Sequence, residues 1–227
     1  CDDPHNYGIL RTSAEDLKFY VKEIAEMGFQ MNTHAIGDST VSVLLNEYKK
    51  ILKDIDDPRW RIEHSQVVDI NEFELYNEKI LPSIQPTHAT SDMYWAYDRL
   101  GSRIKGAYAF KDLLNSSSRV ALGTDFPVEK VNPFHTFYSS VERKDLNGYP
   151  ENGFQMENSL TREETLKGMT IWGAYFNFEE HEKGSLEVGK SADFIVLNQN
   201  IMEVEADLIP NTEVIQTYID GELVYSK

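Results

Sequence analysis

Short apolar segments alternate along the chain with longer segments in which apolar residues recur every three to four positions. The short segments have strand character and cover residues 29–34, 60–63, 80–85 and 120–122. The longer segments predict amphipathic helices over residues 13–27, 37–52, 71–79 and 104–114. Parallel strands need crossover connections, which helices usually provide. Four units of a strand and a following helix therefore predict an α/β fold with a parallel sheet.

The pattern changes in the last third of the chain. Residues 147–159 are polar and loop-like, and Thr161 with Glu164 forms a capping box that predicts a helix reaching about residue 178. Strand character returns over residues 192–197, 214–219 and 222–225, with Asp220-Gly221 as the turn of a hairpin. A β-segment of this length is too short to be stable alone, so we expect it to join strands contributed from elsewhere.

Three of the predicted strands end at, or lead directly to, a residue that can bind a metal ion: His34, His64 and Asp125. The carboxyl ends of parallel strands lie at one edge of a sheet, where the functional groups of such folds gather. Imidazole and carboxylate are the usual ligands of zinc and related cations. A single histidine at a strand end is more often a hydrogen-bonded core residue. The hypothesis of a metal site therefore rests on the matched positions of all three residues.

The sequence around these residues resembles the strand motifs of a known family. Residues 33–38 (THAIGD), 61–66 (RIEHSQ) and 122–128 (LGTDFPV) resemble the fifth, sixth and eighth strand motifs of the amidohydrolase superfamily, in particular its family 3 branch. Residues 83–88 (SIQPTH) resemble the seventh-strand motif. Two later segments, at 132–134 and 184–189, resemble segments that come after the eighth strand in that branch. The matching segments keep the family's order along nearly the whole chain.

The resemblance implies an α/β fold in which residues 1–182 form the second half of a (β/α)8 TIM-like barrel, strands five to eight. Residues 183–227 would form a short segment of the small β-sandwich that accompanies this barrel. The family also has a His-x-His motif on strand one and a bridging lysine, or another bridging residue, on strand four. No His-x-His motif occurs in this sequence. The resemblance therefore implies that the first four strands and part of the metal site are missing from this chain.

The resemblance also implies roles for individual residues. His34 and His64 would be metal ligands, and Asp125 would be both a ligand and the general base that takes a proton from bound water. His88 would contact the substrate or its developing oxyanion, with a purely structural role as the alternative. The cofactor would be a divalent metal, which we expect to be zinc.

The reaction implied by the resemblance is hydrolysis of a carbon–nitrogen bond in a small non-peptide amide, with N-acyl or N-formyl amines as substrates. A metal-dependent deaminase of a ring substrate would use the same residues. A catalytically inactive half-barrel is the third hypothesis. Because the ligands of strands one and four are missing, we expect the isolated chain to show little hydrolase activity with added zinc.

The composition limits the partners and the compartment. The formal net charge is −16, with 38 acidic against 22 basic residues, which argues against nucleic acid or an anionic membrane as a partner. There is one cysteine, and neither a signal peptide nor an apolar run of bilayer-spanning length is visible, so we expect a cytoplasmic protein. The open edges of a half-barrel predict association, either as a homo-oligomer or with a missing amino-terminal half.

Residues 184–191 (GSLEVGKS) match the spacing of a phosphate-binding P-loop. Such a loop needs a helix after it, whose N-terminus binds the phosphate. Here residues 192–197 predict a strand after the motif. We therefore expect a turn that leads into a strand, and no nucleotide binding.

Overall fold

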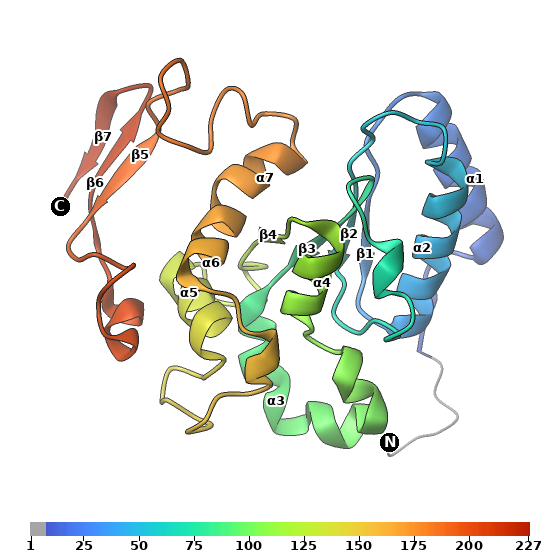
Figure 1. Cartoon of the computed structure of the whole chain (residues 1–227), viewed down its shortest axis with the longest axis horizontal. Coiled ribbons are helices and arrows are strands. Elements are labelled where there is room, and N and C mark those ends of the chain that lie inside the picture. The colour runs from blue at the N-terminus through green and yellow to red at the C-terminus, as the bar shows by residue number, and fades with distance from the viewer. Residues whose placement is uncertain (1–7) are drawn as a thin grey trace. The chain divides into compact units, whose positions relative to one another are not determined.

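The computed structural model describes residues 8–227 and contains two compact units (Figure 1). The first unit comprises the chain up to Ile84 together with Asp92–Val120, and the second comprises Gln85–Ser91 together with Ala121–Lys227. Cys1 and His5 lie outside the described residues. No helix among residues 8–227 combines the length and the apolar character that crossing a lipid bilayer requires.

The first unit is built on a parallel sheet. Its elements are α1 (Ala14–Glu26), β1 (Asn32–Ala35), α2 (Asp38–Ile51), β2 (Trp60–His64), η1 (Phe73–Leu75), β3 (Ile80–Ile84), most of α3 (Pro86–Leu100), η2 (Gly101–Gly106) and α4 (Phe110–Ser117). β1 pairs in parallel with β2, and β2 pairs in parallel with β3. α2 packs on all three strands, and α1 packs on α2 (Figure 1). The prediction of a mixed α/β fold with a parallel sheet is therefore confirmed.

The core of this unit lies between α2 and the sheet. The buried face of α2 consists of Val41, Leu44, Leu45 and Tyr48. On β2, Trp60 and Ile62 are both buried, and the Trp60 ring meets the Tyr48 ring edge-on with their centroids 4.9 Å apart. On β1, the Thr33 hydroxyl lies 2.6 Å from the Tyr48 hydroxyl. Because side chains alternate along a strand, His34 faces away from α2.

Residues 104–114 do not form one helix, contrary to the prediction from their spacing. η2 ends at Gly106 and α4 begins only at Phe110. The chain between them is not helical because it pairs with residues 66–68: the Val68 N–H donates to the Gly106 carbonyl at 2.9 Å, and the Tyr108 N–H donates to the Gln66 carbonyl at 2.8 Å. A Cβ atom at position 106 would collide with the Val68 carbonyl oxygen, which accounts for the glycine there. A contact between distant segments thus overrides the local helical pattern.

The prediction of a helix over residues 71–79 is also wrong. Only the short η1 forms, and turns flank it. The Asp69 carboxylate accepts from the Asn71 N–H at 2.9 Å, and the Asn77 side-chain oxygen accepts from the Lys79 N–H at 2.8 Å. Such bonds between a side chain and the nearby backbone favour turns over helices.

The second unit contains helices followed by an antiparallel sheet. Its elements are β4 (Ala121–Leu122), α5 (Pro133–Glu142), η3 (Met156–Asn158), α6 (Arg162–Met169), α7 (Ile171–Phe176), β5 (Phe194–Leu197), η4 (Ala206–Asn211), β6 (Val214–Ile219) and β7 (Glu222–Ser226). The helix predicted to reach residue 178 is divided at Thr170, whose φ of −129° and ψ of −96° are not helical. A small apolar core joins α5 to the segment around η4 and consists of Phe134, Phe137, Tyr138, Ile201 and Ile209.

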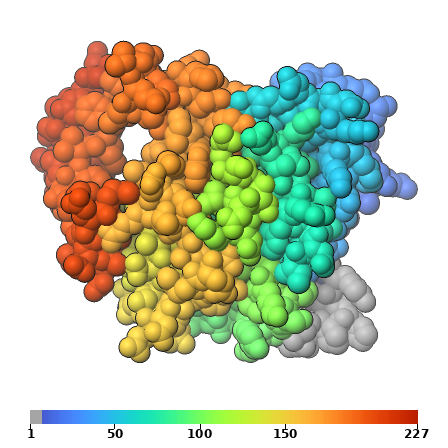
Figure 2. Space-filling model, viewed as in Figure 1, coloured from blue at the N-terminus to red at the C-terminus, as the bar shows by residue number. Residues whose placement is uncertain are grey.

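The C-terminal sheet is a three-stranded antiparallel meander in the order β5, β6, β7. Asp220 and Gly221 have φ values of 50° and 78°, as a two-residue type I′ turn requires, so the predicted hairpin is confirmed. β7 is exposed along its whole length. Figure 2 shows an opening in the surface between this sheet (red) and the helices α6 and α7 (orange). The sheet is therefore attached to its unit over a limited area.

The P-loop-like segment 184–191 has the predicted local structure. It consists of turns and bends, no helix begins at Lys190, and the chain continues into β5. The strand after the motif lacks the free N–H groups that a helix N-terminus offers to phosphate. We keep the expectation that this segment binds no nucleotide.

We expect Thr161→Ala to lower the free energy of unfolding by about 1 kcal/mol. The Thr161 hydroxyl accepts from the Glu164 N–H at 3.1 Å, and the Glu164 carboxylate accepts from the Thr161 N–H at 2.9 Å, so the predicted capping box is present. Alanine leaves the Glu164 N–H without this acceptor. Urea denaturation followed by circular dichroism measures the change, and Thr161→Ser, which keeps the hydroxyl, is the matched control. Equal stability of the alanine and serine variants would contradict the prediction.

Candidate functional site

The carboxyl ends of β1 and β2 bring two histidines together in the first unit. The parallel register places Ala35, the residue after His34, opposite His64. A regular strand would turn His64 toward α2, on the same side as Ile62. Instead, His64 has a left-handed φ of 75°, which turns its side chain out of the strand's regular alternation. The rings of His34 and His64 contact each other edge to face, with their centroids 4.5 Å apart and their planes at 76°.

Hydrogen bonds hold the turn that follows β2. The Ser65 hydroxyl donates to a backbone carbonyl of β2 at 3.1 Å and accepts from the Tyr76 hydroxyl at 2.8 Å. Burial raises the pKa of Tyr76, so its hydroxyl keeps the proton that it donates. The Gln66 side-chain amide donates to the Asp92 carboxylate at 3.0 Å. A left-handed backbone at a residue other than glycine persists only where its surroundings hold it, so these contacts keep His64 in place.

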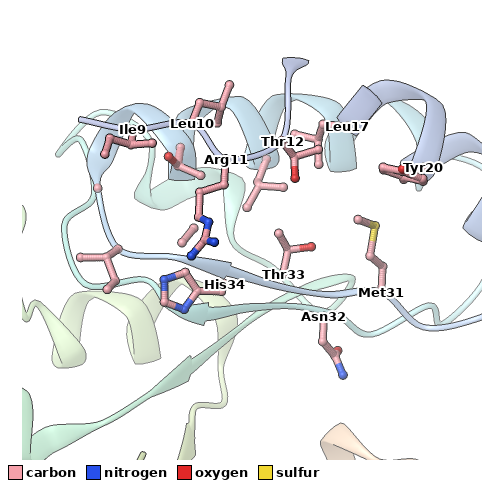
Figure 3. A pocket seen from close by; sticks show the side chains of 15 residues that line it. Ile9, Leu10, Arg11, Thr12, Leu17, Tyr20, Met31, Asn32, Thr33 and His34 are labelled. Atoms are coloured by element: carbon pink, nitrogen blue, oxygen red, sulfur yellow. The ribbon is translucent and has the colours of Figure 1, made fainter. Parts of the chain in front are cut away.

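A cavity of about 630 Å³ lies beside β1 and reaches His34 (Figure 3). We call it the β1 cavity. Its walls are the segment 9–12, the α1 residues Leu17 and Tyr20, the segment 31–37, and Thr40 and Leu44 of α2. Most of these residues are apolar, and the side chain of Arg11 extends toward His34 (Figure 3). The lining includes β1 but no residue of β2, so the cavity follows the side of β1 that faces away from β2.

In the second unit, His88 lies between two carboxylates. Its Nε2 is 3.1 Å from Oδ2 of Asp125, and its Nδ1 is 3.4 Å from Oε1 of Glu129. Ser91 lies one turn further along α3, and its hydroxyl donates a hydrogen bond to the same Glu129 oxygen at 2.6 Å. The His88 side chain is 11% exposed and that of Asp125 is 34% exposed. Asp125 is therefore the more exposed of the two carboxylates, since the Glu129 side chain is only 20% exposed.

The turn after β4 places both carboxylates on the same side. Asp125 has a left-handed φ of 58°. Its carbonyl accepts from the N–H of Val128 at 2.8 Å and from that of Glu129 at 3.4 Å. These bonds form a single helical turn, and residues four apart on such a turn are neighbours. Asp125 and Glu129 can therefore contact the same imidazole ring.

The four residues predicted from the sequence are found as two pairs. His34 lies against His64 in the first unit, and His88 lies against Asp125 in the second. The coordination of one ion by His34, His64 and Asp125 remains a prediction. Glu129 and Ser91 were not predicted. Their only signals in the sequence are the spacing of four residues from Asp125 to Glu129 and of three from His88 to Ser91.

The chemistry of these donors fits a divalent cation. The His34–His64 pair supplies two imidazoles at the ends of paired strands, and Asp125 supplies a partly exposed carboxylate. Neutral imidazole and carboxylate are the ligands that zinc takes in catalytic sites, where three protein ligands leave room for water or substrate. The donor types in each unit are therefore ones that a divalent cation such as zinc takes in proteins.

Comparisons with known proteins agree with this chemistry. Residues 5–225 match the family model described as the amidohydrolase family. The chain is 31% identical over 229 residues to Protein LONG AFTER FAR-RED 3 of Arabidopsis thaliana, covering 99% of this chain and 39% of the relative. It is 31% identical over 230 residues to the Putative amidohydrolase YtcJ of Bacillus subtilis (strain 168), covering 100% of this chain and 43% of the relative.

A more distant relative is the N-substituted formamide deformylase of Arthrobacter pascens, which is 21% identical over 211 residues, covering 89% of this chain and 38% of the relative. Among solved structures, an uncharacterized metal-dependent hydrolase from Pyrococcus horikoshii OT3 is 27% identical with a TM-score of 0.77. That match covers 90% of this chain and 41% of the other. The chain thus spans about two fifths of the length of the relatives it matches.

Proposed function

Because the chain belongs to the amidohydrolase family, we propose that it contributes part of the active site of a hydrolase that cleaves a carbon–nitrogen bond in a small non-peptide amide. The observation that carries the proposal is the His34–His64 pair. The two residues stand at the carboxyl ends of neighbouring parallel strands, and their rings are 4.5 Å apart. Barrel enzymes place their catalytic groups at this end of the strands.

His34, His64 and Asp125 are the proposed ligands of a divalent metal, which we propose to be zinc. When bound, such an ion lowers the pKa of a water molecule and polarises the substrate carbonyl. Asp125 is the proposed general base, since its carboxylate is partly exposed and can accept a proton from the attacking water. His88 lies 3.1 Å from that carboxylate and is the proposed contact for the substrate oxygen.

The proposed substrates are N-acyl or N-formyl amines. Support comes from the strand motifs and from the relative named as an N-substituted formamide deformylase. The test is a panel of N-formyl amines, N-acyl amines and ring amines, incubated with the longest natural polypeptide that contains this chain. Release of formate or another carboxylate together with an amine supports the proposal. Release of ammonia from a ring substrate would instead identify a deaminase.

We propose that residues 1–182 form half of an eight-stranded barrel and that residues 183–227 form part of a β-sandwich. Within residues 8–227, β1 pairs only with β2, and the apolar β1 cavity follows its other side. An open strand edge next to apolar side chains favours pairing with another strand. That strand would come from a missing amino-terminal half or from a second copy of the chain. For the chain alone, we keep the expectation of little hydrolase activity.

Replacing either histidine of the pair is expected to weaken zinc binding. His34→Ala and His64→Ala each remove one proposed ligand. We expect the Kd for zinc to rise at least about tenfold in each variant, because losing even an outer partner of a metal ligand costs roughly 10- to 100-fold. Competition with a chromogenic zinc chelator measures the Kd. His181→Ala is the matched control, since the His181 side chain is 90% exposed.

The three variants together decide whether the histidine pair binds the metal. An unchanged Kd in both His34→Ala and His64→Ala would exclude the pair from the metal site. A loss of similar size in His181→Ala would show that zinc binds to exposed histidines without selectivity. Only the combination of two weakened variants and an unchanged control supports the proposed site.

A further inference from the structure

Two side chains near the turn after β2 have no role in the proposed mechanism. Asp92 lies in the part of α3 that belongs to the first unit, and Tyr108 lies in the segment between η2 and α4. Both bond to the side chain of Gln66, the second residue after β2. Tyr108 is 1% exposed and Gln66 is 9% exposed, so their contact lies in the interior of the unit.

The three side chains form a closed triangle of hydrogen bonds. The Tyr108 hydroxyl donates to Oδ2 of Asp92 at 2.8 Å, and the Gln66 amide nitrogen donates to the same oxygen at 3.0 Å. The same nitrogen also donates to the Tyr108 oxygen at 3.2 Å. A carboxylate only accepts hydrogen bonds, so the nitrogen of the Gln66 amide must face Asp92. All three distances are ordinary for their bonds, so every hydrogen in the triangle has an acceptor.

The triangle joins two strained turns of the backbone. Ser65 and Tyr108 have left-handed φ values of 46° and 52°, as His64 has. The Tyr108 N–H also donates to the Gln66 carbonyl at 2.8 Å, so the two turns are linked through both main chain and side chains. Such conformations gather at functional sites and persist only where the surroundings hold them. The triangle is therefore one of the contacts that hold these two turns.

The position of the His64 ring depends on the turn after β2. Ser65, the next residue, is held by the Tyr76 hydroxyl and by a carbonyl of β2. Gln66 is held by the triangle, which ties it to α3, a helix of 15 residues. The backbone of His64 therefore cannot shift without moving two anchored residues. Its ring contact with His34, at 4.5 Å between centroids, is the geometry that these anchors maintain.

We propose that Asp92 and Tyr108 are positioning residues, which hold Gln66 and thereby keep the His64 ring against His34. The catalytic consequence rests on the function proposed above, in which His34 and His64 bind the metal. Ligands that are held in place by surrounding side chains bind an ion in the required geometry. The contact between the two rings exists without metal, so it can be measured on the metal-free chain.

The test is NMR of the metal-free chain, which follows the nuclear Overhauser cross-peak between the ring protons of His34 and His64. The chain contains six histidines, and His34→Gln and His64→Gln identify the two sets of signals. Tyr108→Phe removes the hydroxyl and keeps the ring in the core. We expect most of the cross-peak intensity to be lost in this variant, because the turn loosens and the signal falls steeply with distance.

Changes at Asp92 supply the matched comparison. Asp92→Ala removes the shared acceptor, so we expect it to lose the cross-peak as Tyr108→Phe does. Asp92→Asn keeps an oxygen that can accept from both donors, so we expect it to retain most of the intensity. The controls are Tyr97→Phe and Asp98→Ala, at exposed positions of the same helix, which should leave the cross-peak unchanged. If Asp92→Ala fails to fold, Tyr108→Phe decides, since it removes a single oxygen atom.

A purely structural role would have a different signature. It would lower the free energy of unfolding, measured by urea denaturation, and leave the cross-peak of the folded molecules unchanged. An unchanged cross-peak in Tyr108→Phe would therefore overturn the proposal. Equal losses in Asp92→Ala and Asp92→Asn would overturn it as well, because the acceptor oxygen would then not be what holds the turn.

The proposed function can fail separately from this inference. If His64 binds zinc, we expect Tyr108→Phe to raise the Kd for zinc as well, by less than His64→Ala does, because the ligand is displaced rather than removed. Absence of zinc binding in the unaltered chain would remove the proposed metal site. The cross-peak and its loss in Tyr108→Phe would still establish that the triangle positions His64.

Discussion

Replacing Asp125 by asparagine is expected to lower kcat by about 100- to 10,000-fold, the usual contribution of a positioned general base. Asparagine has the same shape and keeps an oxygen that can accept a hydrogen bond. It cannot take a proton from water, and its neutral oxygen is a weaker ligand for a cation than a carboxylate. The turn after β4 involves the backbone carbonyl of Asp125, so the substitution leaves its hydrogen bonds in place.

The measurement is the rate of amine release from the best substrate of the panel, in the longest natural polypeptide that contains this chain. Asp56→Asn is the matched control, because Asp56 is an exposed residue in the loop before β2, at the opposite end of that strand from His64. We expect the control to retain full activity. A rate within a few fold of normal in Asp125→Asn would show that another group takes the proton, and it would remove Asp125 from both of its proposed roles.

Replacing Trp60 by alanine is expected to lower the free energy of unfolding by about 3–5 kcal/mol. Trp60 is 1% exposed and begins β2, the strand that carries His64. Its ring packs edge-on against Tyr48, and its indole N–H donates to the Phe29 carbonyl at 3.1 Å. Alanine removes the packing, opens a cavity between α2 and the sheet, and leaves that carbonyl without its donor. A loss of this size is a large part of the roughly 5–15 kcal/mol that stabilises an ordinary domain.

Urea denaturation followed by circular dichroism measures this effect. Trp60→Phe is the matched control, since it keeps an aromatic ring against Tyr48 but loses the indole hydrogen bond. We expect the phenylalanine variant to lose about 1 kcal/mol, the usual net contribution of one hydrogen bond, because the Phe29 carbonyl belongs to an exposed residue. A loss below about 1 kcal/mol in Trp60→Ala would mean that this core relaxes around the missing ring and that β2 does not depend on it.

The elements predicted correctly from the sequence are those whose signals are local. β1 and β2 were recognisable because each is a short apolar segment between two helices. The capping box at Thr161 and the Asp220-Gly221 turn each depend on residues that are close together in the chain. The helix predicted over 104–114 failed because the backbone around Gly106 pairs with Val68, a contact that no local spacing reveals.

The helices α3 and α5 were not predicted, and both begin at a proline. Inside a helix, proline disrupts the hydrogen bonds, so Pro86 and Pro133 argued against helices at these positions. At the first position of a helix, however, proline is favoured, because its missing N–H would have no partner there and its φ is already helical. The Asn132 side chain accepts from the Phe134 N–H at 2.9 Å, a cap that marks the start of α5.

The candidate site shows the same division between local and non-local signals. His34, His64 and Asp125 were predicted because each lies at or just after the end of a strand, and the contact of His34 with His64 could be expected from the parallel order alone. The contacts of Glu129 and Ser91 could not be expected in this way, because they depend on the fold bringing α3 and the turn after β4 together. Pairwise spacing within a helix or turn identifies which residues share a face, but not what that face contacts.

The five residues of β2 include both side chains of the apolar core and a side chain of the candidate site. Trp60 and Ile62 are buried with α2, whereas the left-handed conformation at His64 releases the last side chain of the strand from that alternation. Side-chain volume therefore decides which residues fit at Trp60 and Ile62, whereas the packing against α2 does not constrain the side chain of His64 in the same way. A protein engineer who varies the positions after β2 would therefore leave Ser65 in place, because its fully buried hydroxyl links the strand to Tyr76.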